Sequence, residues 1–495
     1  METASRNKAS KRDALSTLSL FGKAWPGIRR QNGTRFPFAA LGGKCVPDPT
    51  LRTGCIFRLR PRTENASQSF ANKRGTLSGR LLPAHMCILA CHLGPACPAF
   101  LPLLRHFVDR SVACPRARVY SNRYFSNATR CRFDLRDSKG AVMERILGVN
   151  LSGWFIPEPW VTPSLYAATG ASNAAELQEA MGTAAYNERM RHHYETFVSE
   201  DDFRRMAQIG LNAVRLPVPW YAFGSQESDA SYISVVDYID RAIEWAAKYN
   251  IRVLLDLATV PGGQGDSNDS PTTPEVVVEW HSSTNGRHVA LDVLERLADR
   301  YGETESLLGI ELLDTPQMSV RKSLFTMTDG IPAHYLRNFY RDAYELVRSY
   351  MPEDKIVVFS SSGHPGEWKH FMRGAKYKNV YMDLHLYHYR DEYALDITSP
   401  RGLTTAISRN KRELKEAVET GFPVLVGEWS GAAIFANSSV TPEGRNAYER
   451  VFIANQLASF APAAGWFFQT WKTEKRIAAW DARAALGTLE RGMIE

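Results

Sequence analysis

Residues 200–218 read EDDFRRMAQIGLNAVRLPV. The first part, Glu200–Ile209, has the spacing of an amphipathic helix, and Ala213–Val218 is a short apolar run typical of a buried strand. A helix followed at once by such a strand is the unit from which parallel α/β folds are built.

The same alternation continues in both directions. Further strands are predicted at Ile146–Leu151, Arg252–Leu257, Leu307–Leu313, Lys355–Ser360, Val380–Tyr387, Pro423–Trp429 and Gly465–Trp471. Helices are predicted at Val235–Lys248, Val289–Tyr301, Tyr335–Tyr350, Thr404–Glu419 and Gly444–Phe460. Eight strands with crossover helices predict an α/β fold, a closed (β/α)8 TIM barrel. A doubly wound open sheet is the alternative, but it would need a Gly-rich phosphate loop after its first strand, and GVNLSGW at 148–154 is not one.

The first 131 residues have a different composition. They carry 22 Lys and Arg against 5 Asp and Glu, a balance of +17, so residues 132–495 sum to 7 − 17 = −10. The sequence pI of about 8.9 therefore describes neither part and gives no reason to expect a nucleic-acid partner for the barrel. We expect residues 1–131 to be a basic, largely disordered extension and 132–495 to be the barrel, with a hairpin at 133–143 over its floor.

All seven cysteines lie in this extension, at Cys45, Cys55, Cys87, Cys91, Cys97, Cys114 and Cys131. Their odd number and irregular spacing favour unpaired thiols over a disulfide framework or a zinc site. The apolar stretch from Leu81 to Val108 is interrupted by prolines, so membrane association is not expected. No secretory signal follows Met1, although the Arg-rich start loosely resembles a transit peptide.

Active sites of (β/α)8 barrels lie at the C-terminal ends of the strands. Residues suited to acid–base chemistry and binding gather there in this sequence: Glu158, Arg215, Asp314, Thr315, His385, Tyr387, Glu428 and Trp471. One such residue alone is an ordinary loop position, and their joint occurrence is what predicts an active site.

Seven segments carry a family resemblance: GVNLSGWFIPEPWVTPSLY, FVSEDDFRRMAQIGLNAVRLPV, VPGGQG, GIELL, DLHLYHY, VGEWSGA and FFQTWKTE. In this order they cover nearly all of residues 146–474 and resemble the exo-β-1,3-glucanase branch of glycoside hydrolase family 5. The resemblance implies a retaining hydrolase that removes glucose from the non-reducing end of a β-glucan.

By this resemblance Glu428, in VGEWS, matches the nucleophile that forms the covalent glycosyl-enzyme. Arg215 matches the arginine beneath the nucleophile that keeps it ionised. His385 and Tyr387 match residues that hold the sugar and the nucleophile in register.

The resemblance also implies that Glu158 binds sugar hydroxyls in the terminal glucose pocket and that Trp471 is the aromatic floor beneath that glucose.

Three positions depart from the family pattern. The family's fourth strand ends Asn-Glu-Pro, its Glu being the acid/base, and here Asp314 and Thr315 stand before the proline. A sugar-contacting His at the end of the third strand is replaced by Ala258.

A retaining glycosidase needs two carboxyl groups about 5–5.5 Å apart. A threonine hydroxyl cannot protonate a leaving oxygen at neutral pH, and general acid catalysis contributes roughly 10²–10⁴-fold. We therefore expect slow hydrolysis unless another carboxyl donates the proton. Asp314 is one candidate, and Asp266 and Asp269 on the loop after the third strand are two more.

Three hypotheses remain open: a working exo-glucanase with a relocated proton donor, an impaired relative that binds β-glucan ends, and a barrel that only carries a functional N-terminal extension. No metal or organic cofactor is expected, because carboxyl groups and water suffice for the reaction. Sequons at Asn32, Asn65, Asn127 and Asn437 agree with a secreted glycoprotein, whereas Asn150 should be buried in the first strand.

Overall fold

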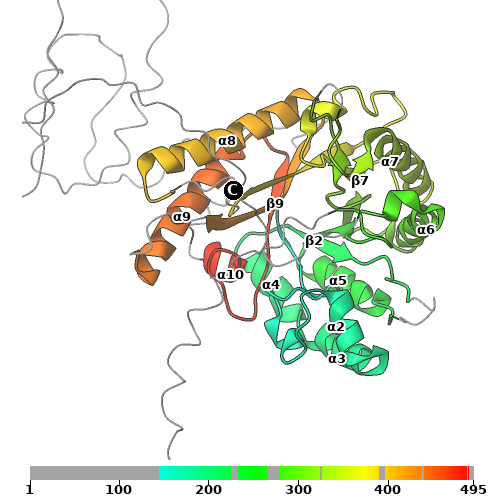
Figure 1. Ribbon diagram of the computed structural model, residues 1–495, viewed down its shortest axis with the longest axis horizontal. Helices are drawn as coiled ribbons and strands as arrows, with labels where there is room; N and C mark the ends of the chain where they lie inside the picture. The colour runs from blue at the N-terminus through cyan, green and yellow to red at the C-terminus, as the bar shows by residue number, and fades with distance from the viewer. Residues whose placement is uncertain are drawn as a thin grey trace, which may run out of the picture. The chain divides into compact units, whose positions relative to one another are not determined.

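Eight parallel strands close into a barrel in the computed structural model, which describes residues 144–224, 232–265, 278–323, 326–389, 396–433, 435, 440–487 and 489. Their order around the barrel is β1, β2, β3, β4, β7, β8, β9, β10, and β10 pairs with β1. Figure 1 shows the helices on the outside of these strands. The predicted (β/α)8 barrel is confirmed, and the open doubly wound sheet is wrong.

The strands of the barrel are β1 (Ile146–Asn150), β2 (Ala213–Val218), β3 (Arg252–Leu257), β4 (Leu307–Glu311), β7 (Ile356–Ser360), β8 (Val380–His388), β9 (Val424–Ala433) and β10 (Gly465–Phe468). Three of them end earlier than predicted, β1 by a single residue. β4 stops at Glu311 and β10 at Phe468 because the chain leaves the ladder there, and the next residues form loops above the barrel. Asp314, Thr315 and Trp471 therefore lie on loops.

The helices between the strands are α4 (Glu200–Gln208), α5 (Val236–Lys248), α6 (Thr284–Tyr301), α7 (Ala333–Arg348), α8 (Pro400–Glu419) and α9 (Pro442–Ser459). Four of them begin earlier than predicted, and three of these, α6, α8 and α9, are capped by Ser283, Ser399 and Thr441. Each side chain accepts a hydrogen bond from the backbone N–H three residues on, at the start of α6, α8 and α9. Between β7 and β8 the described helix is only a short 3-10 turn, η3 (Pro365–Trp368).

Several elements were not predicted. α2 (Ala174–Met181) and α3 (Thr183–Thr196) lie between β1 and α4, and α10 (Ala482–Ala485) follows β10. A 3-10 turn, η1 (Pro163–Tyr166), precedes α2, another, η2 (Trp280–Ser282), precedes α6, and β5 (Met318–Ser319) pairs with β6 (Ile331–Pro332). The predicted hairpin at 133–143 and the extension 1–131 lie outside the described residues, as do Leu81–Val108 and the seven cysteines. Among the helices that the structure describes, none is both long and apolar enough to cross a membrane.

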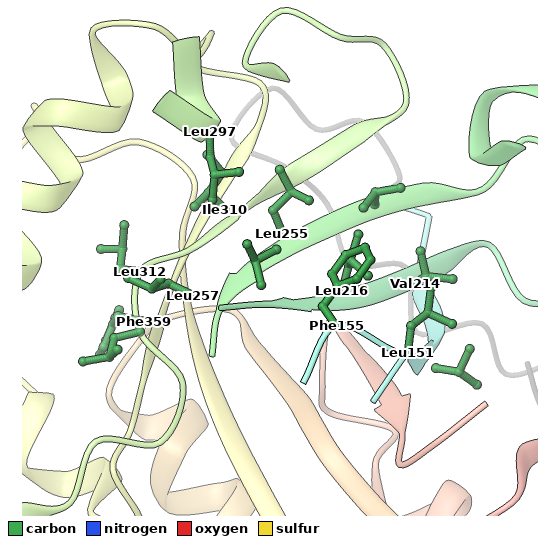
Figure 2. Close-up of a cluster of buried hydrophobic side chains, with 14 of the residues drawn as sticks. Leu151, Phe155, Val214, Leu216, Leu255, Leu257, Leu297, Ile310, Leu312 and Phe359 are labelled. Atoms are coloured by element: carbon green, nitrogen blue, oxygen red, sulfur yellow. The ribbon is translucent and has the colours of Figure 1, made fainter. Parts of the chain in front are cut away.

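The main core lies between the strands and the helices. Figure 2 shows its side chains, among them Leu216 of β2, Leu255 and Leu257 of β3 and Ile310 of β4, with Leu297 of α6 packed against them. These outward-facing residues are fully buried, which explains why both faces of the strands are apolar in the sequence.

The interior of the barrel changes in character along the strands. Its floor is an apolar layer formed by Ile146, Ala213, Leu254, Leu308, Ile356, Val358, Tyr381, Leu425, Ala464 and Phe467. Side chains two residues apart in a strand point the same way. Arg215, Asp256 and Asp383 therefore lie one layer above Ala213, Leu254 and Tyr381, nearer the C-terminal ends of the strands, and all three are buried.

Candidate active site

Arg215 lies at the centre of the charged layer and is fully buried. Its Nη1 donates a hydrogen bond of 3.0 Å to Glu428 Oε1, and its Nε donates one of 2.8 Å to Glu311 Oε2. Its Nη2 lies 2.8 Å from Asp314 Oδ1 and 3.2 Å from Asp256 Oδ2. One guanidinium thus holds carboxylates from β3, β4, the loop after β4, and β9.

Charge in this layer is balanced in part by protons. Burial opposes the charge on Arg215, but its four carboxylate partners raise the pKa of its guanidinium well above the ordinary value. Burial raises the pKa of Glu311 to about 8, against the attraction of Arg215, and raises the pKa of Asp256 well above its usual range. Glu311 is therefore favoured in its protonated form near neutral pH, which reduces the repulsion between the carboxyl groups around Arg215.

Glu428 on β9 is oriented by groups on both of its oxygens. Arg215 contacts Oε1, and the Tyr387 hydroxyl donates a hydrogen bond of 2.9 Å to Oε2. His385 Nδ1 lies 3.6 Å from the same Oε2. His385 and Glu428 are register partners in the β8–β9 pair, so the barrel itself sets this contact. A carboxylate held in one position beside a cation is suited to act as a nucleophile.

Asp383 fixes the other side of the His385 ring. Its Oδ2 lies 2.6 Å from His385 Nε2. Burial alone would raise the pKa of Asp383, but the neighbouring His385 and Arg215 leave it below its ordinary value. Gly427 makes room for this carboxylate, because a Cβ at that position would collide with Asp383 Oδ1. Asp383 on the neighbouring strand β8 thus requires a glycine at position 427.

Glu158 lies in the loop after β1 and accepts a hydrogen bond of 2.8 Å from Trp160 Nε1. Burial raises the pKa of Glu158 to about 7, with Trp160 acting in the opposite direction. The Trp160 ring packs against Trp480, with 4.9 Å between ring centroids, and Trp480 packs against Tyr387 at 5.6 Å. An aromatic cluster thus connects the Glu158 loop to a residue that contacts Glu428.

Thr315 borders a cavity of about 700 Å³ that is also lined by His385 and Tyr387. The cavity extends over η3 and along α8, in the region where no longer helix separates β7 from β8. The backbone φ of Thr315 is +28°, which a β-branched residue rarely adopts. Among the described residues, no hydrogen bond engages the Thr315 hydroxyl. The side chain at position 315 thus adjoins the residues that orient Glu428 without being tied to any of them.

The backbone carbonyl of Ala258 is linked to the Asp314 loop by the side chain of Gln264. The Gln264 side-chain amide donates hydrogen bonds of 2.8 Å to the Ala258 carbonyl and 3.2 Å to the Asp314 carbonyl. Gln264 therefore ties the end of β3 to the loop that carries Asp314 and Thr315.

Trp471 follows β10 and is buried, with 2% of its surface exposed. Its Nε1 donates a hydrogen bond of 2.8 Å to Asp202 Oδ1 on α4, so its polar edge points to a surrounding helix.

The structure brings most of the predicted site residues together. Arg215, Asp314, His385, Tyr387 and Glu428 are joined by the contacts above, Thr315 shares a cavity with two of them, and Glu158 is linked through aromatic rings. Asp266 and Asp269 lie outside the described residues. Sequence reasoning missed several residues that contact this network, among them Asn150, Asp256, Gln264, Glu311 and Asp383. The signal was available for Asp256 and Asp383, since each stands two residues beyond an apolar inward-facing position.

Within the described part of the chain, two groups of side chains lie close enough together to share an ion, Asp314–Asp383–His385 and Asp256–Glu311–Asp314, with their ligand atoms within 4.8 Å of one another. In the second group, Arg215 contacts both Asp256 and Asp314. In the first group, His385 contacts Asp383. These contacts give the carboxylates partners within the protein, and the absence of a cofactor stays a prediction.

Glu428, the carboxylate held by Arg215, thus lies in the middle of β9 within the charged layer of the barrel. The profile of the family described as Cellulase (glycosyl hydrolase family 5) matches residues 176–466, more than half of the chain. The chain therefore belongs to glycosyl hydrolase family 5.

Curated relatives are more specific. A probable glucan 1,3-beta-glucosidase A of Aspergillus clavatus is 30% identical over 386 residues, which are 70% of this chain and 87% of the relative. The protein of the same name from Aspergillus niger is 29% identical over 363 residues, 66% of this chain and 83% of the relative. A glucan 1,3-beta-glucosidase of Pichia angusta is 29% identical over 397 residues, 70% of this chain and 85% of the relative. Within its family the chain is thus related to exo-1,3-β-glucanases.

Among solved structures, the rutinosidase from Aspergillus niger superposes with a TM-score of 0.58 at 19% identity, covering 71% of this chain and 98% of that chain. At this identity the likeness concerns the fold alone.

Proposed function

We propose that the barrel binds the non-reducing end of a β-glucan, β-1,3-glucan in the first place, and that it hydrolyses natural glucans slowly. The observation that carries the proposal is that the candidate nucleophile, Glu428, is held by hydrogen bonds on both oxygens, while a threonine stands at position 315, where the family has its acid/base glutamate. Glu428 has Arg215 at 3.0 Å and Tyr387 at 2.9 Å on its two oxygens.

The binding part of the proposal rests on Glu158, Tyr387 and the relatives. Glu158 offers carboxyl oxygens beside Trp160, and such a carboxyl next to aromatic rings suits the hydroxyls and the apolar face of glucose. The curated relatives are named for glucan 1,3-β-glucosidase activity, which supports a β-1,3-glucan as the ligand.

The chemical part rests on Thr315. In a retaining mechanism the nucleophile displaces the leaving oxygen while a second carboxyl group protonates it. Thr315 lines the same cavity as His385 and Tyr387, but its hydroxyl is too weak an acid to protonate a leaving oxygen at neutral pH. Formation of the glycosyl-enzyme should then depend on the leaving group, and its hydrolysis should lack a general base.

A working hydrolase with Asp314 as the proton donor is the second candidate. Asp314 has the most exposed side chain of Arg215's carboxylate partners, at 20%, so it can approach a ligand more easily than the others. Against this role, Asp314 Oδ1 is already engaged by Arg215 at 2.8 Å.

The test is to assay the full chain on an aryl β-glucoside with a good leaving group and on laminarin, each with and without azide. We expect azide-stimulated turnover of the aryl glucoside and little action on laminarin, because the activated leaving group needs no proton and azide replaces the general base. Glu428→Gln should abolish turnover of the aryl glucoside and is the control for the nucleophile.

Three other outcomes would change the assignment. Rapid laminarin hydrolysis without azide would overturn slow hydrolysis, and its loss in Asp314→Asn would identify Asp314 as the proton donor. Binding of laminarin oligosaccharides without any turnover of the aryl glucoside would indicate a glucan-binding protein that has lost its chemistry. Failure to bind or cleave any β-glucoside would overturn the proposal.

A further inference from the structure

A second cavity, of about 630 Å³, lies beside α3 and the loop after β10. It shares no lining residue with the cavity beside Thr315. Five of its lining residues are permanent or near-permanent cations, namely Arg189, Arg205, Lys472, Arg476 and Arg483, and its one acidic lining residue is Glu474. Such an excess of positive charge inside a concave surface attracts anions.

The cations reach this cavity from three separate segments. Arg189 belongs to α3, Arg205 to α4, and the other three to the loop after β10 and to α10. They therefore surround the cavity and are not a single charged face of one helix. His192 and His193 of α3 also line it.

Carboxylates hold three of the cations in place. Lys472 Nζ lies 2.7 Å from Asp202 Oδ2, and Arg483 Nη2 lies 2.6 Å from Asp481 Oδ2. Arg205 Nε lies 2.6 Å from Asp201 Oδ2. None of these three aspartates lines the cavity.

The other two cations have no carboxylate partner within the described part of the chain. Arg189 donates a hydrogen bond of 2.8 Å to the Leu165 carbonyl, which leaves its charge unmatched. No hydrogen bond or ion pair engages the Arg476 side chain among the described residues. Glu474 accepts from Ser164 with both oxygens, at 2.5 Å from the hydroxyl and 2.9 Å from the backbone N–H.

The geometry points to a binding site for a small molecule that carries more than one phosphate-type anionic group. Guanidinium groups bind such oxyanions through two parallel hydrogen bonds, and several cations around one cavity favour a ligand with charge at more than one position. The site is independent of glucan hydrolysis.

The experiment is isothermal titration of the full chain with pyrophosphate and, at matched ionic strength, with sulfate. We expect saturable pyrophosphate binding that weakens as salt is added, with sulfate binding more weakly because it carries fewer charges. The double variant Arg189→Ala/Arg476→Ala should weaken pyrophosphate binding by roughly tenfold or more.

The matched control is Arg191→Ala/Lys475→Ala, which removes two exposed cations from the same helix and the same loop that do not line the cavity. It should bind pyrophosphate like the parent. All four side chains removed are exposed, and an unchanged melting temperature without pyrophosphate verifies that each variant is folded.

Several results would overturn the inference. No pyrophosphate binding at about 1 mM would remove the site. Equal affinity in the Arg189→Ala/Arg476→Ala variant would place the anion elsewhere, for example on the basic residues 1–131. Equal loss in the control would show a general effect of surface charge. Equal affinity for sulfate would remove the requirement for a ligand with more than one anionic group.

Discussion

The indole Nε1 of Trp471 donates a hydrogen bond of 2.8 Å to Asp202 Oδ1, and this joins the loop after β10 to the first turn of α4. The other oxygen of Asp202 accepts from the backbone N–H of Ser199 at 2.9 Å and from Lys472 Nζ at 2.7 Å. One carboxylate thus caps a helix, neutralises a buried lysine and orients a tryptophan.

Asp202→Ala should therefore have a large effect. It leaves Lys472 without its partner and removes the cap of α4, so we expect the free energy of unfolding to fall by about 3 kcal/mol or more in chemical denaturation. Asp201→Ala is the matched control, because Asp201 pairs only with surface arginines and should contribute less than about 1 kcal/mol. Similar losses in the two variants would contradict a structural role specific to Asp202.

Glu158 predicts a pH-dependent stability. Burial raises its pKa from 4.5 to about 7, so the folded chain favours the protonated carboxyl. Its favourable contribution is fully present below pH 4.5 and is lost as the pH rises to about 7. Glu158→Gln stays neutral, so its melting temperature relative to the parent should increase between pH 4.5 and 7 and then level off, by a few degrees in all. A difference that does not change with pH would contradict this assignment.

Arg215 predicts a stability defect that acid relieves. Arg215→Met leaves Asp256, Glu311, Asp314 and Glu428 without their shared cation, and breaking a buried ion pair costs about 3–5 kcal/mol. The loss should be smaller at pH 6 than at pH 9, because burial raises the pKa of Glu311 to about 8 and more of this carboxyl is uncharged at the lower pH. Thermal unfolding across this range measures it. Arg300→Met, which removes a partly exposed ion pair with Asp240, is the control and should cost less than about 1 kcal/mol.

Position 315 predicts a gain of activity. Thr315→Glu should raise kcat/KM on laminarin by roughly 10²–10⁴-fold and remove the stimulation of aryl-glucoside turnover by azide. Thr315→Gln introduces a side chain of the same length as glutamate that cannot act as an acid, and this variant should behave like the parent. An increase of the same size in both variants would show that side-chain size and not acid catalysis limits the rate.

Much of the barrel could be predicted because its strands are short apolar runs, each buried on both faces. α3 was missed, although its buried Tyr186, Met190 and Tyr194 recur every four residues. Polar residues fill the positions between them and weaken the pattern of an apolar face. The starts of α6, α8 and α9 were placed late because the capping residues stand before the apolar pattern begins.

The site was predicted in part for a similar reason. Glu428 and Arg215 stand in recognisable motifs, whereas Glu311 lies in an apolar strand whose inward direction depends on the barrel's register. That register shifts between Val253 and Leu254 relative to β4, so counting residues along β4 does not give the direction of Glu311. The contacts of Gln264 depend on the path of its loop, which follows from tertiary packing.

The position of Thr315 separates folding from chemistry in this barrel. Arg215 is fully buried and its guanidinium joins four carboxyl groups, whereas Thr315 is only half-buried and its hydroxyl makes no hydrogen bond among the described residues. Substitutions at that one position can therefore accumulate or revert at little cost to the barrel. If position 315 supplies the acid/base, as proposed above, the catalytic rate can change by orders of magnitude in evolution while the fold and the Glu428 carboxylate stay the same.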